Sequence, residues 1–132
     1  MPYVLQGASE EPLGYYTLSC YSISAKELPP SIAKRLPPYP EVPAILLGRL
    51  AIHQDLEGKG YGKALLVEAL ERCFKISKTV GALGVVVDAI DEKANAWYQK
   101  FGFAPFPDSK NRLFLPMSTI SELVGALPQP QT

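Results

Sequence analysis

Three glycines on alternate positions, Gly58, Gly60 and Gly62, separate an apolar run from a helix-forming run, and they constrain the fold more than any other feature. Residues 44–52 (AILLGRLAI) are too apolar to alternate cleanly, which predicts a central strand. Residues 65–73 repeat apolar side chains at three- and four-residue spacing, which predicts an amphipathic helix. The chain must therefore fold through a strand, a tight glycine turn and a helix.

The glycine turn predicts an anion-binding loop, because glycine lets the backbone approach a ligand closely and the start of a helix favours negative charge. The P-loop pattern does not fit: Gly58 and Gly62 have three residues between them instead of four, and Ala64 follows Lys63 where a hydroxyl is required. The dinucleotide pattern G-x-G-x-x-G lacks its third glycine. A tight turn without a ligand is the alternative.

Short strands and helices alternate along the rest of the chain. Residues 3–7 and 13–23 predict an antiparallel hairpin, and Gly48 is a candidate bulge in the strand that follows. Six of the 13 prolines lie between Pro29 and Pro43, which indicates a connection with at most a short helix. The later predicted elements are a buried strand at 83–90, a helix at 91–101 that ends at Gly102, an edge strand at 112–117 and a helix at 118–127.

This order predicts a single α/β (α+β) domain over residues 1–127, followed by a disordered tail at 128–132. The formal net charge is zero, so bulk charge gives no argument for nucleic acid or membrane binding. Cys20 and Cys73 do not make a disulfide framework and are expected to fill the core of a cytoplasmic protein. We find no membrane-spanning run, no signal peptide and no metal-ligand spacing.

The segment EGKGYG, from Glu57 through Gly58, Lys59, Gly60 and Tyr61 to Gly62, resembles the R/Q-x-x-G-x-G/A signature of the GNAT acetyltransferases. In that family the loop follows a strand, opens a helix and holds the pyrophosphate of acetyl-CoA. Glu57 replaces the usual Arg or Gln, and Lys59 and Lys63 could supply the missing positive charge. The resemblance implies a mixed sheet splayed between two central strands, with helices on both faces. The backbone of Leu50, Ala51 and Ile52 is then expected to pair with the cofactor.

The segment AWYQKFGF (96–103) resembles a second element of the same family. Its tyrosine, Tyr98 here, lies near the thioester sulfur and protonates the departing thiolate. Family members often have Asn seven residues earlier, where this chain has Asp91, the expected cofactor contact. Without the resemblance, a core aromatic with a satisfied hydroxyl would be the commoner interpretation of Tyr98.

The flanks of both motifs look like those of the GNAT toxins of bacterial toxin–antitoxin pairs. These enzymes acetylate the α-amino group of aminoacyl-tRNA and so block translation. They usually carry a further strand and helices before the hairpin, which we expect to be missing here. The expected partners are aminoacyl-tRNA, a ribbon-helix-helix antitoxin and a second copy of the chain in a homodimer. The alternatives are acetylation of a protein or small-molecule amine, and a non-catalytic acetyl-CoA-binding module.

Several other polar residues allow more than one role. Arg49 could contact RNA phosphate, the terminal adenosine or an acidic neighbour, and His53 could relay protons or be a solvated residue at the strand end. Lys26, Lys34 and Arg35 are candidates for a local tRNA-binding patch or for a solvated loop.

Overall fold

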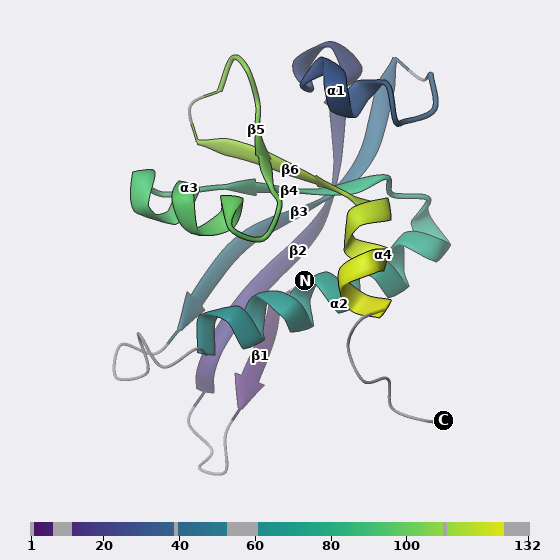
Figure 1. The fold of residues 1–132 in the computed structure, drawn as a ribbon. Coiled ribbons are helices and arrows are strands. Elements are labelled where there is room, and N and C mark those ends of the chain that lie inside the picture. Colours follow the sequence, from purple (N-terminus) through teal and green to yellow (C-terminus); the bar gives the residue numbers. More distant parts are fainter. Residues whose placement is uncertain (1, 7–11, 39, 53–60, 110, 126–132) are drawn as a thin grey trace.

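The computed structural model describes residues 2–6, 12–38, 40–52, 61–109 and 111–125, and gives the backbone alone for 2–6, 12–13, 49, 51–52, 61 and 125. Six strands form one mixed sheet in the order β1-β2-β3-β4-β6-β5 (Figure 1). The strands are β1 (Pro2–Gln6), β2 (Pro12–Ser24), β3 (Glu41–Ile52), β4 (Gly84–Asp88), β5 (Ala104–Pro105) and β6 (Arg112–Pro116). The helices are the 3-10 turn η1 (Ala25–Glu27), α1 (Pro30–Ala33), α2 (Tyr61–Val80), α3 (Glu92–Gln99) and α4 (Met117–Gly125).

The centre of the sheet is a short parallel pairing between β3 and β4. Only residues 45–47 of β3 are in register with 85–87 of β4 among the described residues. β3 then continues to Ile52 while paired with β2 alone. Figure 1 shows the two strands side by side at the centre and diverging toward their C-terminal ends. The sheet is therefore splayed between its two central strands, as expected.

A β-bulge lies where β3 leaves β4. Leu18 is opposite Leu47 and Tyr16 is opposite Leu50, so Gly48 and Arg49 together face one residue of β2. A Cβ atom at Gly48 would lie 2.7 Å from the Thr17 hydroxyl oxygen, which explains the glycine. Bulges bend a strand and increase its twist. The bulge predicted at Gly48 is confirmed, and it turns β3 at the point where the opening begins.

Two buried clusters lie on opposite faces of the sheet. The larger cluster joins one face to α2, α3 and α4, with Leu65, Tyr98 and Ile120 as examples. The smaller cluster covers the other face with Ile32 of α1 and Phe106. Helices thus lie on both faces. In the described part of the chain, the α-helix on the second face is α1, which has four residues. None of the described helices combines the length and the apolar character that a membrane span requires.

Most predicted elements are present, but two of the strands and one cysteine differ from the prediction. β3 begins at Glu41, because Pro43 pairs with Ser22 and its carbonyl oxygen accepts a hydrogen bond from Leu83 N–H at 2.8 Å. The strand at 112–116 is internal, since the two-residue strand β5 pairs with its outer side. Cys73 is fully buried as predicted, whereas Cys20 is exposed, so the prediction for Cys20 was wrong.

The crowding around Gly84 gives a test of the packing. An alanine Cβ at this position would overlap the Phe114 ring and lie 2.8 Å from the Leu115 carbonyl oxygen. We expect Gly84→Ala to lower the free energy of unfolding by about 2 to 3 kcal/mol. The control is Gly81→Ala, which meets no atom within 4 Å but has a φ of +72° and should cost about 1 kcal/mol. Urea denaturation of both variants measures this, and a smaller loss for Gly84→Ala would contradict the packing described.

Candidate active site

The turn from β4 into α3 follows directly after the end of the β3–β4 pairing. Asp91 adopts an extended conformation, and its side chain accepts a hydrogen bond from Ala94 N–H at 2.8 Å, which caps the helix. α3 ends after Gln99, and Gly102 follows with a φ of +98° that favours glycine. The predicted glycine stop is confirmed. Asp91, predicted as a cofactor contact, uses one carboxylate oxygen to hold the start of α3.

Tyr98 lies on the side of α3 that faces the core. Its side chain is 8% exposed, and its ring makes edge-to-face contacts with Trp97 and Phe103 at centroid distances of 5.2 and 5.4 Å. Burial raises the pKa of Tyr98 from 10.0 to about 12. The phenol is therefore fully protonated at neutral pH, and it is a weaker acid than an exposed tyrosine.

The core around Tyr98 connects this residue to the opening of the sheet. Tyr98 belongs to the same buried cluster as Leu47 and Val87, the last paired residues of the two central strands. Ala89, directly after β4, belongs to it too. Tyr98 and the end of the β3–β4 pairing thus share one buried cluster.

The backbone of β3 beyond Leu47 continues past the end of its pairing with β4. Alternate residues of a strand direct their N–H and C=O groups toward each neighbour. On the β4 side, residues 48–52 have no register partner among the described residues. The backbone of Leu50, Ala51 and Ile52 is in β3, where a ligand could pair with it. The structure does not describe the side chains of Arg49, Ala51 and Ile52.

The predicted phosphate loop is described only at its end. Glu57, Gly58, Lys59 and Gly60 lie outside the described residues, as does His53. α2 begins at Tyr61, which places Gly62 and the exposed Lys63 in the first turn of a 20-residue helix. The predicted order of strand, glycines and helix is therefore confirmed at both flanks.

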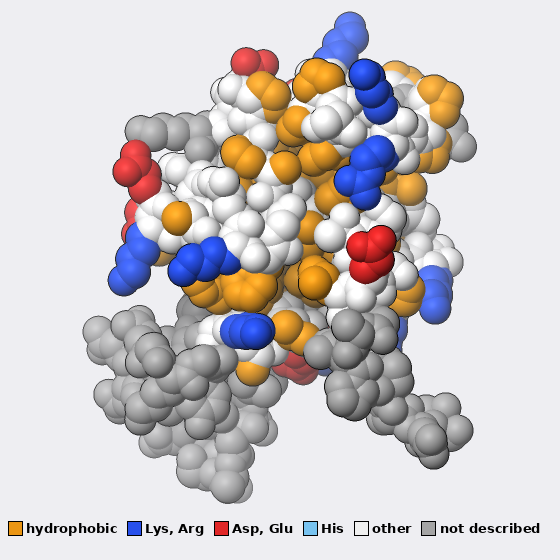
Figure 2. Space-filling view, viewed as in Figure 1, with side chains coloured by type: hydrophobic (Ala, Val, Ile, Leu, Met, Phe, Trp, Pro, Cys, Tyr) orange, Lys and Arg blue, Asp and Glu red, His pale blue; other side chains and the backbone are white. Residues whose placement is uncertain are grey.

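The basic residues of the proline-rich connection lie elsewhere. Lys34 and Arg35 follow α1 at the end of the sheet where β3 begins, whereas the opening is at the end where β3 finishes (Figure 1). Both are exposed, as is Lys26, and Arg35 donates a hydrogen bond to the Ser118 hydroxyl at 3.2 Å. Lysine and arginine side chains gather near α1 in the space-filling view (Figure 2). The structure does not place these residues at the opening.

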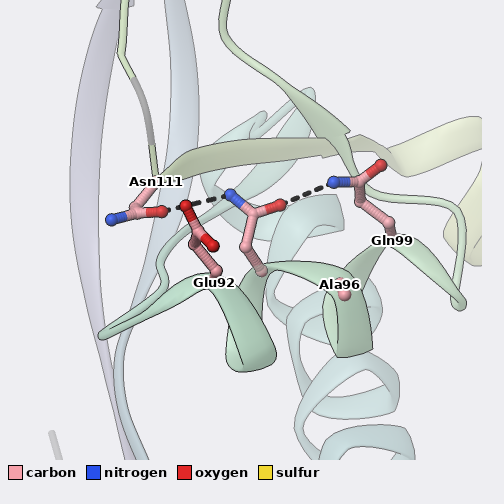
Figure 3. A pocket seen from close by; sticks show the side chains of 5 residues that line it. Glu92, Ala96, Gln99 and Asn111 are labelled. Atoms are coloured by element: carbon pink, nitrogen blue, oxygen red, sulfur yellow. Dashed lines mark hydrogen bonds between the residues drawn. The ribbon is translucent and has the colours of Figure 1, made fainter.

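A polar cavity of about 280 Å³ that the sequence did not indicate lies on the other side of α3. Its lining residues are Glu92, Asn95, Ala96, Gln99 and Asn111. Asn95 is 9% exposed; it donates to the Asn111 side-chain oxygen at 3.3 Å and accepts from Gln99 at 2.6 Å (Figure 3). The Asn111 carbonyl oxygen also accepts from Ala89 N–H at 2.8 Å. The side-chain amides thus hydrogen-bond to one another, and through Asn111 they connect α3 to the end of β4 and the start of β6. The sequence did not indicate this role of Asn95, because Asn111 is 16 positions away in the chain.

No group of three or more His, Cys, Asp and Glu side chains in the described ranges could hold a metal ion.

Comparison with known proteins gives consistent matches. The family described as "Acetyltransferase (GNAT) domain" matches residues 5–105. "Probable toxin TacT" of Sinorhizobium fredii is 32% identical over 120 residues, which are 86% of this chain and 66% of the relative. "tRNA-acetylating toxin" of Mycobacterium tuberculosis is 32% identical over 113 residues, 86% of this chain and 67% of the relative. The chain spans about two thirds of the length of these curated relatives.

Solved structures agree with the family match. AtaT complexed with acetyl-methionyl-tRNAfMet has a TM-score of 0.82 at 36% identity, covering 92% of this chain and 74% of that chain. A tyrosine-to-phenylalanine mutant of the AtaT toxin, bound to acetyl-CoA and the C-terminus of the antitoxin AtaR, has a TM-score of 0.75 at 31% identity. That match covers 94% of this chain and 71% of that chain.

The pKa of Tyr98 predicts how stability depends on pH. The unfolded chain loses this phenol proton near pH 10, whereas the folded protein keeps it to about pH 12. Between these values the folded state binds more protons, so the free energy of unfolding falls as pH rises. From pH 9 to pH 11 the wild type should lose roughly 1 to 1.5 kcal/mol more than Tyr98→Phe. Urea denaturation at both pH values measures this, and equal losses would contradict the burial of the hydroxyl.

Proposed function

Because the chain belongs to the GNAT acetyltransferase family, we propose that it transfers the acetyl group of acetyl-CoA to the α-amino group of aminoacyl-tRNA. The observation that carries the proposal is the early end of the β3–β4 pairing, whose last paired residues share a buried cluster with Tyr98. The named relatives support the choice of acceptor, since one is a tRNA-acetylating toxin and another was solved with acetyl-methionyl-tRNA.

In the proposed binding mode, acetyl-CoA lies between the ends of β3 and β4. The backbone of Leu50 to Ile52 pairs with it, and the amides from Gly58 to Gly62, with Lys59 and Lys63, bind its pyrophosphate. Backbone N–H groups of β3 then polarise the thioester carbonyl. The residues present fit such a ligand, because the β4 side of β3 lacks a strand partner among the described residues and α2 starts directly after the glycines.

The chemistry needs one acid and no strong base. The amine attacks the carbonyl carbon, the C–N bond forms as the C–S bond breaks, and the thiolate takes the proton of the Tyr98 hydroxyl. The amine releases a proton to solvent, and the phenolate regains one from it. An α-amino group has a pKa near 8, against about 10.4 for lysine, so a useful fraction is neutral at pH 7. Tyr98, held protonated by burial, supplies the acid.

Two partner assignments are part of the same proposal. An antitoxin, which we expect to be a ribbon-helix-helix protein, would bind the chain, since a structural relative was solved with the C-terminus of its antitoxin. A homodimer would cover apolar side chains such as Val80 of α2 and Leu123 of α4, which are 45% and 41% exposed. We place these reactions in the cytoplasm, where charged tRNA is found.

The general acid is tested by removing a single oxygen atom. Tyr98→Phe should bind acetyl-CoA normally but lower the rate of acetyl transfer by about 10²- to 10⁴-fold. The rate of transfer is measured with labelled acetyl-CoA and with charged tRNA, deacylated tRNA or polyamines as acceptors. Tyr15→Phe is the matched control, because Tyr15 is 41% exposed on β2 and its loss should leave the rate unchanged. Label on polyamines or protein lysines, with none on charged tRNA, would contradict the proposed acceptor.

The basic residues near α1 predict a salt-dependent contact with tRNA phosphates at a distance from the reacting amine. Lys34→Glu should weaken tRNA binding severalfold and reduce the slope of log affinity against log salt by about one. Lys75→Glu is the control, because Lys75 lies on α2, on the opposite face of the sheet. Fluorescence anisotropy at several salt concentrations measures both. Equal effects of the two variants would remove the patch from the proposal.

A further inference from the structure

The sheet consists of two halves that meet at the β3–β4 seam. One half is β1-β2-β3 and the other is β4-β6-β5. In the part of the chain that the structure describes, three residue pairs join them, from Ile45–Val85 to Leu47–Val87, with a further hydrogen bond from Leu83 N–H to the Pro43 carbonyl oxygen at 2.8 Å. Because few main-chain hydrogen bonds hold this seam, side-chain contacts across it can set the angle between the two halves.

One cluster of side chains crosses this seam. Arg112 of β6 donates to both carboxylate oxygens of Asp88 on β4, at 2.7 and 3.0 Å. A third N–H group of the same guanidinium donates to the hydroxyl of Tyr21 on β2. The guanidinium carbon also lies 5.0 Å from the centre of the Tyr21 ring. Tyr21 belongs to one half of the sheet, and Arg112 and Asp88 belong to the other.

Asp88 and Arg112 lie where the strands begin to part, whereas Tyr21 is opposite Ala44, one residue before the pairing begins. Asp88 directly follows Val87, the last residue of β4 that is paired with β3. Side chains alternate along a strand, so Asp88 and Arg112 lie on the face of Val86 and Phe114, and Tyr21 packs against the same buried cluster. Tyr98 lies on the opposite face. The cluster therefore spans one face of β3 along the length of its pairing with β4, from the start of the pairing to its end.

The chemistry of the cluster favours a fixed geometry. A planar guanidinium that binds a carboxylate through two parallel hydrogen bonds has little freedom to rotate. The Arg112 side chain is 26% exposed and that of Asp88 is 50% exposed, so solvent weakens the attraction without removing the fork. The hydrogen bonds to Asp88 raise the pKa of Arg112 further, so the group stays charged.

We propose that Tyr21, Arg112 and Asp88 are positioning residues that hold the two halves of the sheet at the angle acetyl-CoA requires. The link to acetyl-CoA rests on the proposed function, whereas the control of the seam does not. Arg112 orients the end of β4 through Asp88 and anchors it to β2 through Tyr21. Loss of the Tyr21 hydroxyl frees the halves to change their angle, which lowers cofactor affinity while leaving the acid Tyr98 in place.

The experiment compares Tyr21→Phe, which keeps the ring, with Ser22→Ala. Ser22 is the next residue on β2, and its hydroxyl donates to Glu41 at 3.4 Å within a single half of the sheet. Without ligand, hydrogen exchange of the backbone amides at Val85–Val87 should be about tenfold faster in Tyr21→Phe, with the amides between β1 and β2 unchanged. Ser22→Ala should show no such local change. Arg112→Lys, which keeps the charge but loses the fork, should act as Tyr21→Phe does.

Kinetics separate positioning from general destabilisation. Tyr21→Phe should raise the Kd and KM for acetyl-CoA roughly threefold to tenfold, with kcat and the KM for the acceptor close to wild type. Exchange that rises evenly over the whole sheet, or a change in the acceptor KM alone, would overturn the proposal. Failure of the wild type to bind acetyl-CoA would contradict the proposed function instead, while the exchange experiment would still decide whether the cluster holds the seam.

Discussion

The parallel pairing of β3 with β4 ends after Leu47 and Val87, and the rest of the site depends on this early end. β3 can continue because β2 supplies hydrogen bonds on its other side, and the bulge at Gly48 turns it away. β4 cannot follow, because it ends at Asp88 and a capped helix starts four residues later, at Glu92. The strands thus part for separate local reasons, and the parting exposes backbone groups to a ligand.

Burial alone shifts the pKa of Tyr98. Its ring is enclosed by Trp97 and Phe103, and loss of hydration raises its pKa to about 12 without a charged partner. The phenol is protonated at neutral pH, which the proposed transfer to the departing thiolate requires, and its raised pKa makes it a weaker acid than an exposed tyrosine. The same helix is fixed from its other side by the Asn95 amide, which hydrogen-bonds to Asn111.

Local patterns in the sequence predicted the elements and the order of the motifs, because strands, helix caps and glycine turns depend on neighbouring residues. The helix stop at Gly102 and the bulge at Gly48 were found in this way. Contacts between distant residues left no such pattern. Tyr21 and Arg112 are 91 positions apart, and the two-residue strand β5 exists only because β6 is there to pair with it. Asp91 caps α3 through Ala94, only three residues away, a local contact that the sequence analysis did not assign because it gave Asp91 to the cofactor.

The central claim is that acetyl-CoA binds to the backbone that β3 exposes beyond its pairing with β4. Hydrogen exchange of the backbone amides, measured with and without acetyl-CoA, tests this most directly because it reports on individual segments of the sheet. The account predicts slower exchange at residues 48–52 of β3 and in the first turn of α2, with β5 unchanged. Protection confined to other segments, or none at all at a saturating concentration of acetyl-CoA, would contradict it.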